Sequence, residues 1–406
     1  MAGTRMARVP NKGAAASAIG VITGKGRTGD ARSIAPASTA TTLFAGWTSR
    51  GAVDESVRVS SFADFERAFG GLDPRSPLGY GVQHFFQNGG RAALVARIVE
   101  AGAEGKVLAP ADKAFQTALL QRLGPGAATD AGRIDAFNLL CVPGLVHAGT
   151  IARLQRACRQ RRAFMIIDSA PGATAATMAA SGTSGLTGAD GAFSALYFPW
   201  IRATDPMQGG ALRDFPPCGF VAGVIARTDL VRGVWKAPAG TEARLAGASG
   251  LSLPVDDAQV AALTRRGVNC LRMLPGDGAA AIWGARTLLA EDDPGVDWRY
   301  VPVRRTALFI EESIHQGTRW VVFEPNGEAL WANIRTTVGA FMAGLFRKGA
   351  FMGTTLREAC FVKCDRGTMT QDDIDNGVVN IEVGFAPLKP AEFVVIRIRH
   401  VVGAAS

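Results

Sequence analysis

Four short apolar segments between residues 137 and 273 alternate with stretches long enough for helices, and this alternation restricts the possible folds more than any other feature. The segments span residues 137–142, 164–168, 194–198 and 268–273. A strand that is apolar on both faces is typical of a parallel sheet covered by helices on both sides. The sequence therefore predicts an α/β middle domain over residues 106–295.

The length of the chain favours more than one domain. It has 406 residues, 48% of them hydrophobic and 19% charged, so it can bury a large core and is too apolar to be disordered. Changes in composition divide it into five segments: residues 1–40, 41–105, 106–295, 296–391 and 392–406. We expect the first and the last to be extended arms and the other three to be folded.

Each arm contains a candidate β-strand. The C-terminal candidate consists of Phe393, Val394, Val395, Ile396, Arg397, Ile398 and Arg399, and the N-terminal one of Gly20, Val21, Ile22 and Thr23. An apolar terminal strand carries unpaired backbone groups and aggregates unless it is paired. Each strand therefore either closes a sheet of its own chain or adds to a sheet of a neighbour. Pro387 and Pro390 precede the C-terminal strand and predict a hinge there.

The segment from 296 to 391 shows two helical patterns and one further strand pattern. A first helix presents Val303, Ala307, Ile310 and Ile314 on one face, and an apolar run at 320–323 predicts a strand. Asn326 is the expected N-cap of a long helix, and Gly349 ends it. The buried stripe of that helix would be Leu330, Ile334, Val338, Phe341 and Leu345.

The net charge of +9 is spread over dispersed arginines, so direct binding to nucleic acid is not expected. The densest basic runs are residues 159–162 and Arg304–Arg305, both on predicted helices. The simpler interpretation is a solvated helix face. The alternative is a basic surface that faces an acidic protein partner.

Candidate catalytic groups do not form a recognisable motif. Residues 24–29 match G-x-G-x-x-G, but no helical pattern follows, so a flexible loop is favoured over a nucleotide site. A hydrolase triad would have to come from His147, Asp168 and one of Ser169, Ser181 or Ser184, and no G-x-S-x-G segment is present. Asp168 is equally well placed to cap a helix. We therefore expect no catalytic residue.

No cofactor or metal is expected either. The six cysteines are scattered, which predicts buried free thiols. The acidic run Asp372-Asp373-x-Asp375 lacks the glycine and distal glutamate of a calcium loop, and more simply opens a short helix after Thr370. No apolar run reaches about 18 residues, so membrane insertion is not expected. The first residues lack a signal-peptide pattern, which favours synthesis in the cytoplasm.

Long segments of the chain resemble tail sheath proteins of contractile phages and related injection systems. Residues 300–353, which begin YVPVRRTALFIEESIHQGTRW, carry the clearest resemblance. Further segments that match in order are ACFVKCD (359–365), DIDNG (373–377) and APLKPAEF (386–393). VSSFADF (59–65), FFQNGG (85–90), PPCGFVAG (216–223) and VWKAPAG (234–240) are also similar. The resemblance extends from about residue 20 to residue 401.

The resemblance implies a structural subunit that polymerises as stacked hexameric rings around an inner tube and contracts to drive the tube through a target envelope. It implies an α/β subtilisin-like middle domain without a catalytic triad. It also implies an α+β domain built from N- and C-terminal parts, residues 41–105 and 296–391. The expected partners are further copies of the chain, the inner tube protein, the baseplate and a tail-terminator or cap protein.

The resemblance also assigns roles to particular residues. Neighbouring subunits of such sheaths exchange N- and C-terminal strands, which here would be residues 20–23 and 393–399. If the inner tube is acidic, Arg335, Arg347 and Lys348 on the long helix are candidate contacts. Assembly would take place in the bacterial cytoplasm, within a phage tail, a bacteriocin or an extracellular injection system.

The residues alone are also compatible with two other interpretations. One is an α/β hydrolase-like or nucleotide-binding enzyme. The other is a monomeric binding module whose terminal strand closes its own sheet.

Overall fold

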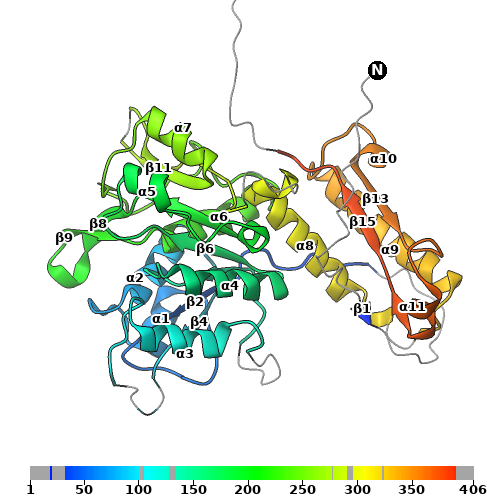
Figure 1. The fold of residues 1–406 in the computed structure, drawn as a ribbon, viewed down its shortest axis with the longest axis horizontal. Coiled ribbons are helices and arrows are strands. Elements are labelled where there is room, and N and C mark those ends of the chain that lie inside the picture. The colour runs from blue at the N-terminus through cyan, green and yellow to red at the C-terminus, as the bar shows by residue number, and fades with distance from the viewer. Residues whose placement is uncertain are drawn as a thin grey trace, which may run out of the picture.

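The fold was established from a computed structural model that describes residues 19–20, 33–100, 102, 105–127, 134–276, 278–289, 296–321 and 324–389. The chain forms a larger part around a central sheet and a smaller part at the C-terminal side (Figure 1). Helix α8 (Val301–Gly317) runs from the larger part to the smaller one. No helix among the described residues is long and apolar enough to cross a membrane.

Within the described chain, eight strands form the central sheet of the larger part. In order across the sheet they are β12 (Ala280–Ile282), β11 (Val268–Met273), β7 (Ser194–Phe198), β6 (Phe164–Asp168), β5 (Leu139–Cys141), β2 (Thr42–Gly46), β4 (Ala93–Arg97) and β3 (Val57–Val59). The six inner strands pair in parallel, whereas β12 and β3 are antiparallel edges. This confirms the predicted parallel sheet.

Helices cover both faces of this sheet, as right-handed crossovers between parallel strands require. One layer contains α2 (Pro77–Gln87) and α6 (Cys218–Arg232), which pack on each other and on β2, β5 and β6. The other contains α3 (Lys113–Leu123), α4 (Ala148–Gln160), α5 (Ala175–Ser181) and α7 (Asp257–Arg265). Helix α1 (Phe62–Phe69) follows the N-cap Ser61, whose side chain accepts from the Asp64 amide, and ends at Gly70.

Glycines allow α2 and α6 to cross closely. A Cβ at Gly219 would lie 2.3 Å from the carbonyl oxygen of Gly81, and one at Gly223 would lie 2.5 Å from that of Phe85. The two helix backbones are therefore in contact, and a larger residue at either glycine would force them apart. This contact sets the start of α6 against the carboxyl ends of β5 and β6.

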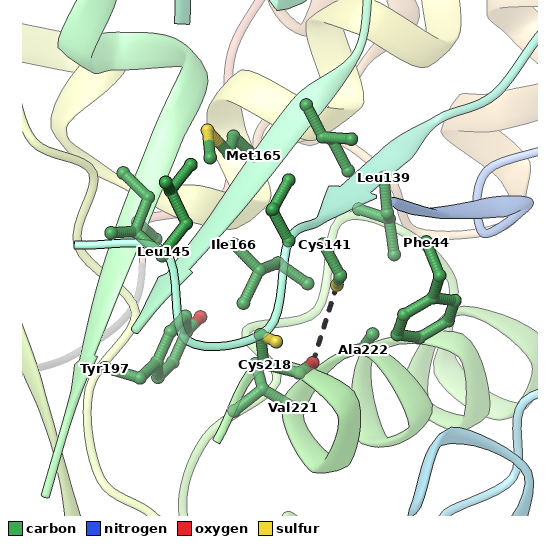
Figure 2. Close-up of a cluster of buried hydrophobic side chains, with 14 of the residues drawn as sticks. Phe44, Leu139, Cys141, Leu145, Met165, Ile166, Tyr197, Cys218, Val221 and Ala222 are labelled. Atoms are coloured by element: carbon green, nitrogen blue, oxygen red, sulfur yellow. Dashed lines mark hydrogen bonds between the residues drawn. The ribbon is translucent and has the colours of Figure 1, made fainter. Parts of the chain in front are cut away.

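The core between α6 and the sheet is apolar and contains two cysteines. Figure 2 shows Cys141 on β5 and Cys218 on α6 among Phe44, Met165 and Tyr197, with the Cys141 Sγ 3.6 Å from the Cys218 carbonyl oxygen. All six cysteines are free, and five of them are buried. The prediction of buried free thiols is therefore confirmed, with Cys360 half-buried.

A projecting hairpin adds a small second sheet to the larger part. It consists of β8 (Ile201–Asp205) and β9 (Ala211–Phe215), with β10 (Gly250–Leu251) on the far side of β8. Short 3₁₀ turns connect the elements: η1 (Ala189–Phe193), η2 (Pro206–Gln208), η3 (Val296–Arg299) and η4 (Arg319–Val321).

The smaller part packs short strands on one long helix. Helix α9 (Glu328–Arg347) lies beside β13 (Cys360–Lys363), which pairs with β15 (Glu382–Phe385). Helices α10 (Leu356–Ala359) and α11 (Gln371–Asp375) and strand β14 (Val378–Val379) complete it. The predicted stripe of α9, from Leu330 to Leu345, is buried in a second core. Thr370 caps α11, as expected.

The N-terminal chain joins the two parts. Strand β1 (Ile19–Gly20) pairs with β14 in the smaller part. Further along, Ile34 packs against Gly317 at the end of α8, and the Ala37 amide donates to the Ser313 Oγ at 3.0 Å. Residues 33–41 therefore run along α8 toward β2, so that both chain ends contribute to the smaller part (Figure 1).

Three local predictions were wrong. Residues 319–321 form the 3₁₀ turn η4 and not the start of a strand, because a short apolar run does not distinguish strand from helix. The N-cap of α9 is Gly327, while the Asn326 side chain instead accepts from the Trp331 Nε1 at 2.8 Å. Residues 41–105, expected beside the C-terminal part, supply β2, β3 and β4 to the same sheet as the middle segment.

Candidate assembly interface

The N-terminal strand candidate is partly described and is engaged within its own chain. Gly20 pairs with Val378 in a short antiparallel ladder, while Val21, Ile22 and Thr23 lie outside the described residues. The ladder joins two strands of two residues each. So small a ladder is marginal by itself and leaves room for a further strand.

The C-terminal strand candidate, residues 393–399, lies outside the described residues, but its point of departure is well defined. Phe351 forms an antiparallel bridge with Pro387, and the Ala386 amide donates to the Ala359 carbonyl at 2.8 Å. Pro387 is therefore fixed to the smaller part, which moves the expected hinge beyond it. The described chain continues to Lys389, which with Leu388 lines the cleft between the larger and the smaller part.

The β13–β15 ladder is an incomplete sheet. It has two strands in the described chain, and most of their side chains are half-buried. Each strand has one partner, so one edge of each remains available for backbone pairing. Such an edge is the kind of surface to which an extended strand adds.

The three candidate contacts for an inner tube lie in different environments. The Arg335 Nη2 donates to the Glu328 Oε1 at 2.7 Å, and its Nη1 donates to the Cys364 carbonyl. Arg335 therefore belongs to the internal structure of the smaller part. Arg347 and Lys348, about 18 Å further along α9, are exposed.

Lys348 lies on a cleft between the larger and the smaller part. The cleft has a volume of about 680 Å³. Its residues come from the end of α6 and the loop after it, α7, the chain just after β12, the first turn of α8, the end of α9 and the chain after β15. Its cations are Arg232, Lys236, Lys348 and Lys389. No local sequence signal identifies this cleft, because its residues come from segments far apart in the chain.

Arg304 and Arg305 do not form a solvated basic face, and that prediction was wrong. Both are buried in the first turns of α8. The Arg304 guanidinium lies 3.8 Å from the centroid of the Trp298 ring, and burial lowers its pKa to about 10. The Arg305 guanidinium binds both carboxylate oxygens of Asp229 on α6, at 2.8 and 2.6 Å.

The arginine pair instead anchors the start of α8 to the larger part. Arg305 also donates to the Thr39 carbonyl at 2.9 Å, so one side chain joins α8, α6 and the N-terminal segment. A buried arginine needs this many acceptors because an unpaired buried charge is costly. The sequence gives no sign of this, since Asp229 is 76 residues away.

The candidate triad residues have structural contacts. His147 caps α4, its Nδ1 lying 2.9 Å from the Thr150 Oγ1. The Asp168 carboxylate accepts the backbone amides of Gly144 at 2.9 Å and Cys218 at 2.8 Å. It thereby fixes the turn after β5 to the start of α6. The structure brings Asp168 to these two amides and not to His147.

Asp168 should give the folded chain a measurable pH dependence. Burial raises the pKa of its carboxyl to about 6, although the two amides oppose the rise. The folded chain thus holds this proton more tightly than the unfolded chain, so the stabilisation is fully present below about pH 4 and is lost as the pH rises through about 6. Between pH 4.5 and 7, the free energy of unfolding of the wild type should fall by roughly 2 kcal/mol relative to that of Asp168→Asn.

Urea unfolding of both proteins at the two pH values tests this expectation. The asparagine also places an amide opposite a backbone N–H, so we expect it to be less stable overall. This loss of stability is the same at both pH values, so it cancels when the change in the free energy of unfolding between them is compared. Equal pH slopes for the two proteins would contradict the assignment.

The chain is similar to known proteins over most of its length. The family model "Phage tail sheath protein central domain" matches residues 126–288, and "Phage tail sheath C-terminal domain" matches residues 293–400. A putative prophage major tail sheath protein of Pseudomonas aeruginosa (strain UCBPP-PA14) is 26% identical over 312 residues, 75% of this chain and 76% of that protein.

Two solved assemblies contain chains with the same fold. The first is the contracted sheath complex of an extracellular contractile injection system, PVC. It aligns with a TM-score of 0.75 and 27% identity, over 94% of this chain and 97% of that one. The second is the baseplate of the anti-feeding prophage, AFP, with a TM-score of 0.71 and 28% identity, over 94% and 98%.

Proposed function

The chain belongs to the phage tail sheath family, and on this premise we propose that it polymerises by exchanging terminal strands between neighbouring subunits. It is a sheath subunit of a contractile tail or injection particle. The observation that carries the proposal is the position of the arms. Strand β1 pairs with the two-residue strand β14, and the C-terminal chain is fastened at Pro387 just after β15, a strand with one pairing partner in the described chain.

The geometry gives the exchange a physical basis. A strand that adds to a sheet edge is held by backbone hydrogen bonds, which depend little on how the two subunit bodies are oriented. The smaller part anchors the C-terminal chain at Pro387, and residues 390–406 follow as a tether. Subunits linked in this way can rotate relative to one another without separating.

The partners follow from this role. Copies of the chain would form stacked hexameric rings, with the inner tube inside, a baseplate at one end and a terminator or cap at the other. Arg347 and Lys348 are exposed and remain candidates for contact with an acidic inner tube. Arg335 is less suitable, because its guanidinium already donates to Glu328 and to the Cys364 carbonyl. Synthesis and assembly would take place in the bacterial cytoplasm.

A structural role without catalysis is part of the proposal. The contacts of Asp168 and His147 support a purely structural role for both residues. The parallel sheet with helices on both faces is compatible with a subtilisin-like arrangement of residues 106–295. The enzyme alternative has no support from the family or from the solved assemblies.

Electron microscopy of negatively stained protein tests the proposal. We expect the purified chain, at high concentration or with its co-expressed inner tube protein, to form hollow tubes or stacked rings. Gel filtration of the same sample separates these from a monomer of 42.5 kDa. Monomers that persist in the presence of the tube protein would contradict the proposal.

A further inference from the structure

The cleft between the two parts has the composition of a protein-binding site. Trp235 and Trp283 lie on it beside Arg232, Lys236 and Lys348, and none of its lining residues is acidic among those described. Trp283 is 37% exposed. Tryptophan and arginine are among the residues that most often anchor a protein partner.

Its positive charge is only partly compensated. Arg232 is paired with Glu242 outside the cleft, at 2.6 Å. Lys236 donates to the neighbouring Ala237 carbonyl at 3.3 Å, and within the described chain neither it nor Lys348 forms an ion pair. The cleft therefore favours an acidic occupant.

Charge excludes the undescribed chain ends as occupants. The C-terminal arm, residues 392–406, carries Arg397 and Arg399 and a single acidic side chain, Glu392, and the first residues carry Arg5, Arg8 and Lys12, so neither end provides an acidic segment. Like charges placed together oppose binding. The occupant must come from an acidic surface.

The chain itself provides such a surface on helix α11. Asp372 and Asp375 are exposed there, and within the described residues neither carboxylate has a cationic partner. Asp373 is already used, since its carboxylate accepts from Thr370 and Asn380. The Asp375 Oδ1 accepts from the Gln371 Nε2 at 2.8 Å within the same helix. Asp372 and Asp375 are nevertheless exposed and have no cation beside them in the described chain, so both carboxylates can face another molecule.

A single copy cannot bring these two surfaces together. Pro302, in the first turn of α8, lines the cleft, whereas α11 lies beyond the other end of that helix (Figure 1). The 17 residues of α8 separate them by about 25 Å. Complementary surfaces at opposite ends of a subunit make head-to-tail contacts, which build rings or helices.

We infer that the acidic helix α11 of one subunit docks into the cationic cleft of a neighbouring subunit. The contact rests on the proposed polymerisation and adds to it a second link beside the exchanged strands. The occupant would touch Lys236 and Trp283 of the larger part and Lys348 of the smaller part at once. It would therefore fix the angle between the two parts of the subunit that receives it.

A charge-exchange experiment on the full-length chain tests this inference. The variants Lys236→Glu/Lys348→Glu and Asp372→Lys/Asp375→Lys should each raise the critical concentration for polymerisation about tenfold or more at low salt. Combining all four substitutions should return the critical concentration to within about threefold of the wild-type value. Sedimentation of polymer measures the critical concentration, and thermal unfolding of the monomer checks the fold.

The control carries the same change of charge elsewhere. Lys113→Glu/Arg153→Glu alters two exposed cations on α3 and α4 that form no ion pair with any described residue, and it should polymerise like the wild type. Failure of the four-fold variant to recover would overturn the inference. So would cleft variants that weaken polymerisation while α11 variants do not, since the cleft would then bind a different acidic protein. A wild type that never polymerises would instead overturn the proposed function.

Discussion

Removal of residues 390–406 is expected to abolish polymerisation while leaving the fold intact. Ala386 and Pro387 already fasten the chain to the smaller part, and the described core ends before residue 390. The free energy of unfolding of the truncated chain should therefore lie within about 0.5 kcal/mol of the wild-type value. If the C-terminal strand pairs with a neighbour, the truncated chain lacks the backbone bonds that link subunits. Sedimentation and electron microscopy should show no tubes at any accessible concentration.

A substitution inside the strand shows whether the deletion acts through lost strand pairing or only through a shorter chain. Ile396→Pro removes one backbone N–H and cannot extend a ladder, so it should prevent assembly almost as well as the deletion. Ile396→Val retains both strand propensity and the N–H and should assemble normally. Normal tubes from the proline variant or from the truncated chain would contradict strand exchange.

Replacing Arg305 with alanine is expected to cause the largest loss of stability among single changes. The substitution leaves the buried Asp229 carboxylate and the Thr39 carbonyl without their shared donor. Removing one partner of a buried ion pair costs about 3–5 kcal/mol. We expect a loss of that size in urea unfolding, and an increased sensitivity to proteolysis at residues 33–41, which Arg305 helps to hold.

An exposed ion pair at the end of α6, the helix that carries Asp229, is the matched control. Arg232 binds Glu242 through two short contacts, but both side chains are about half exposed. Arg232→Ala should therefore cost about 0–1 kcal/mol. Losses of similar size for the two arginines would show that the burial of Arg305 has no special effect. The double variant Arg305→Met/Asp229→Leu should recover most of the loss, because it leaves no unpaired charge.

The elements that could be predicted are those whose signal is local. The apolar runs at 164–168 and 194–198 became β6 and β7 at the same residues, because a strand buried on both faces has few polar positions. The caps at Ser61 and Thr370 were predictable because capping depends on a few neighbouring residues. The family resemblance added the role of the chain, which no local pattern contains.

The features that could not be predicted depend on contacts between distant residues. Arg304–Arg305 looks like a surface pair in the sequence, and its burial depends on Asp229, Trp298 and Thr39. The cleft likewise combines residues from Arg232 to Lys389. The position of β2 between β5 and β4 is another long-range result, since no pattern within residues 41–105 specifies strand order.

The most direct test of strand exchange is a helical reconstruction of the assembled sheath by electron cryomicroscopy, at a resolution that traces backbones. Strand exchange predicts that residues 393–399 of each subunit pair with strands of the smaller part of a neighbouring subunit. Density that places this strand on β13 or β15 of its own subunit, with the subunits joined by side-chain contacts alone, would contradict it.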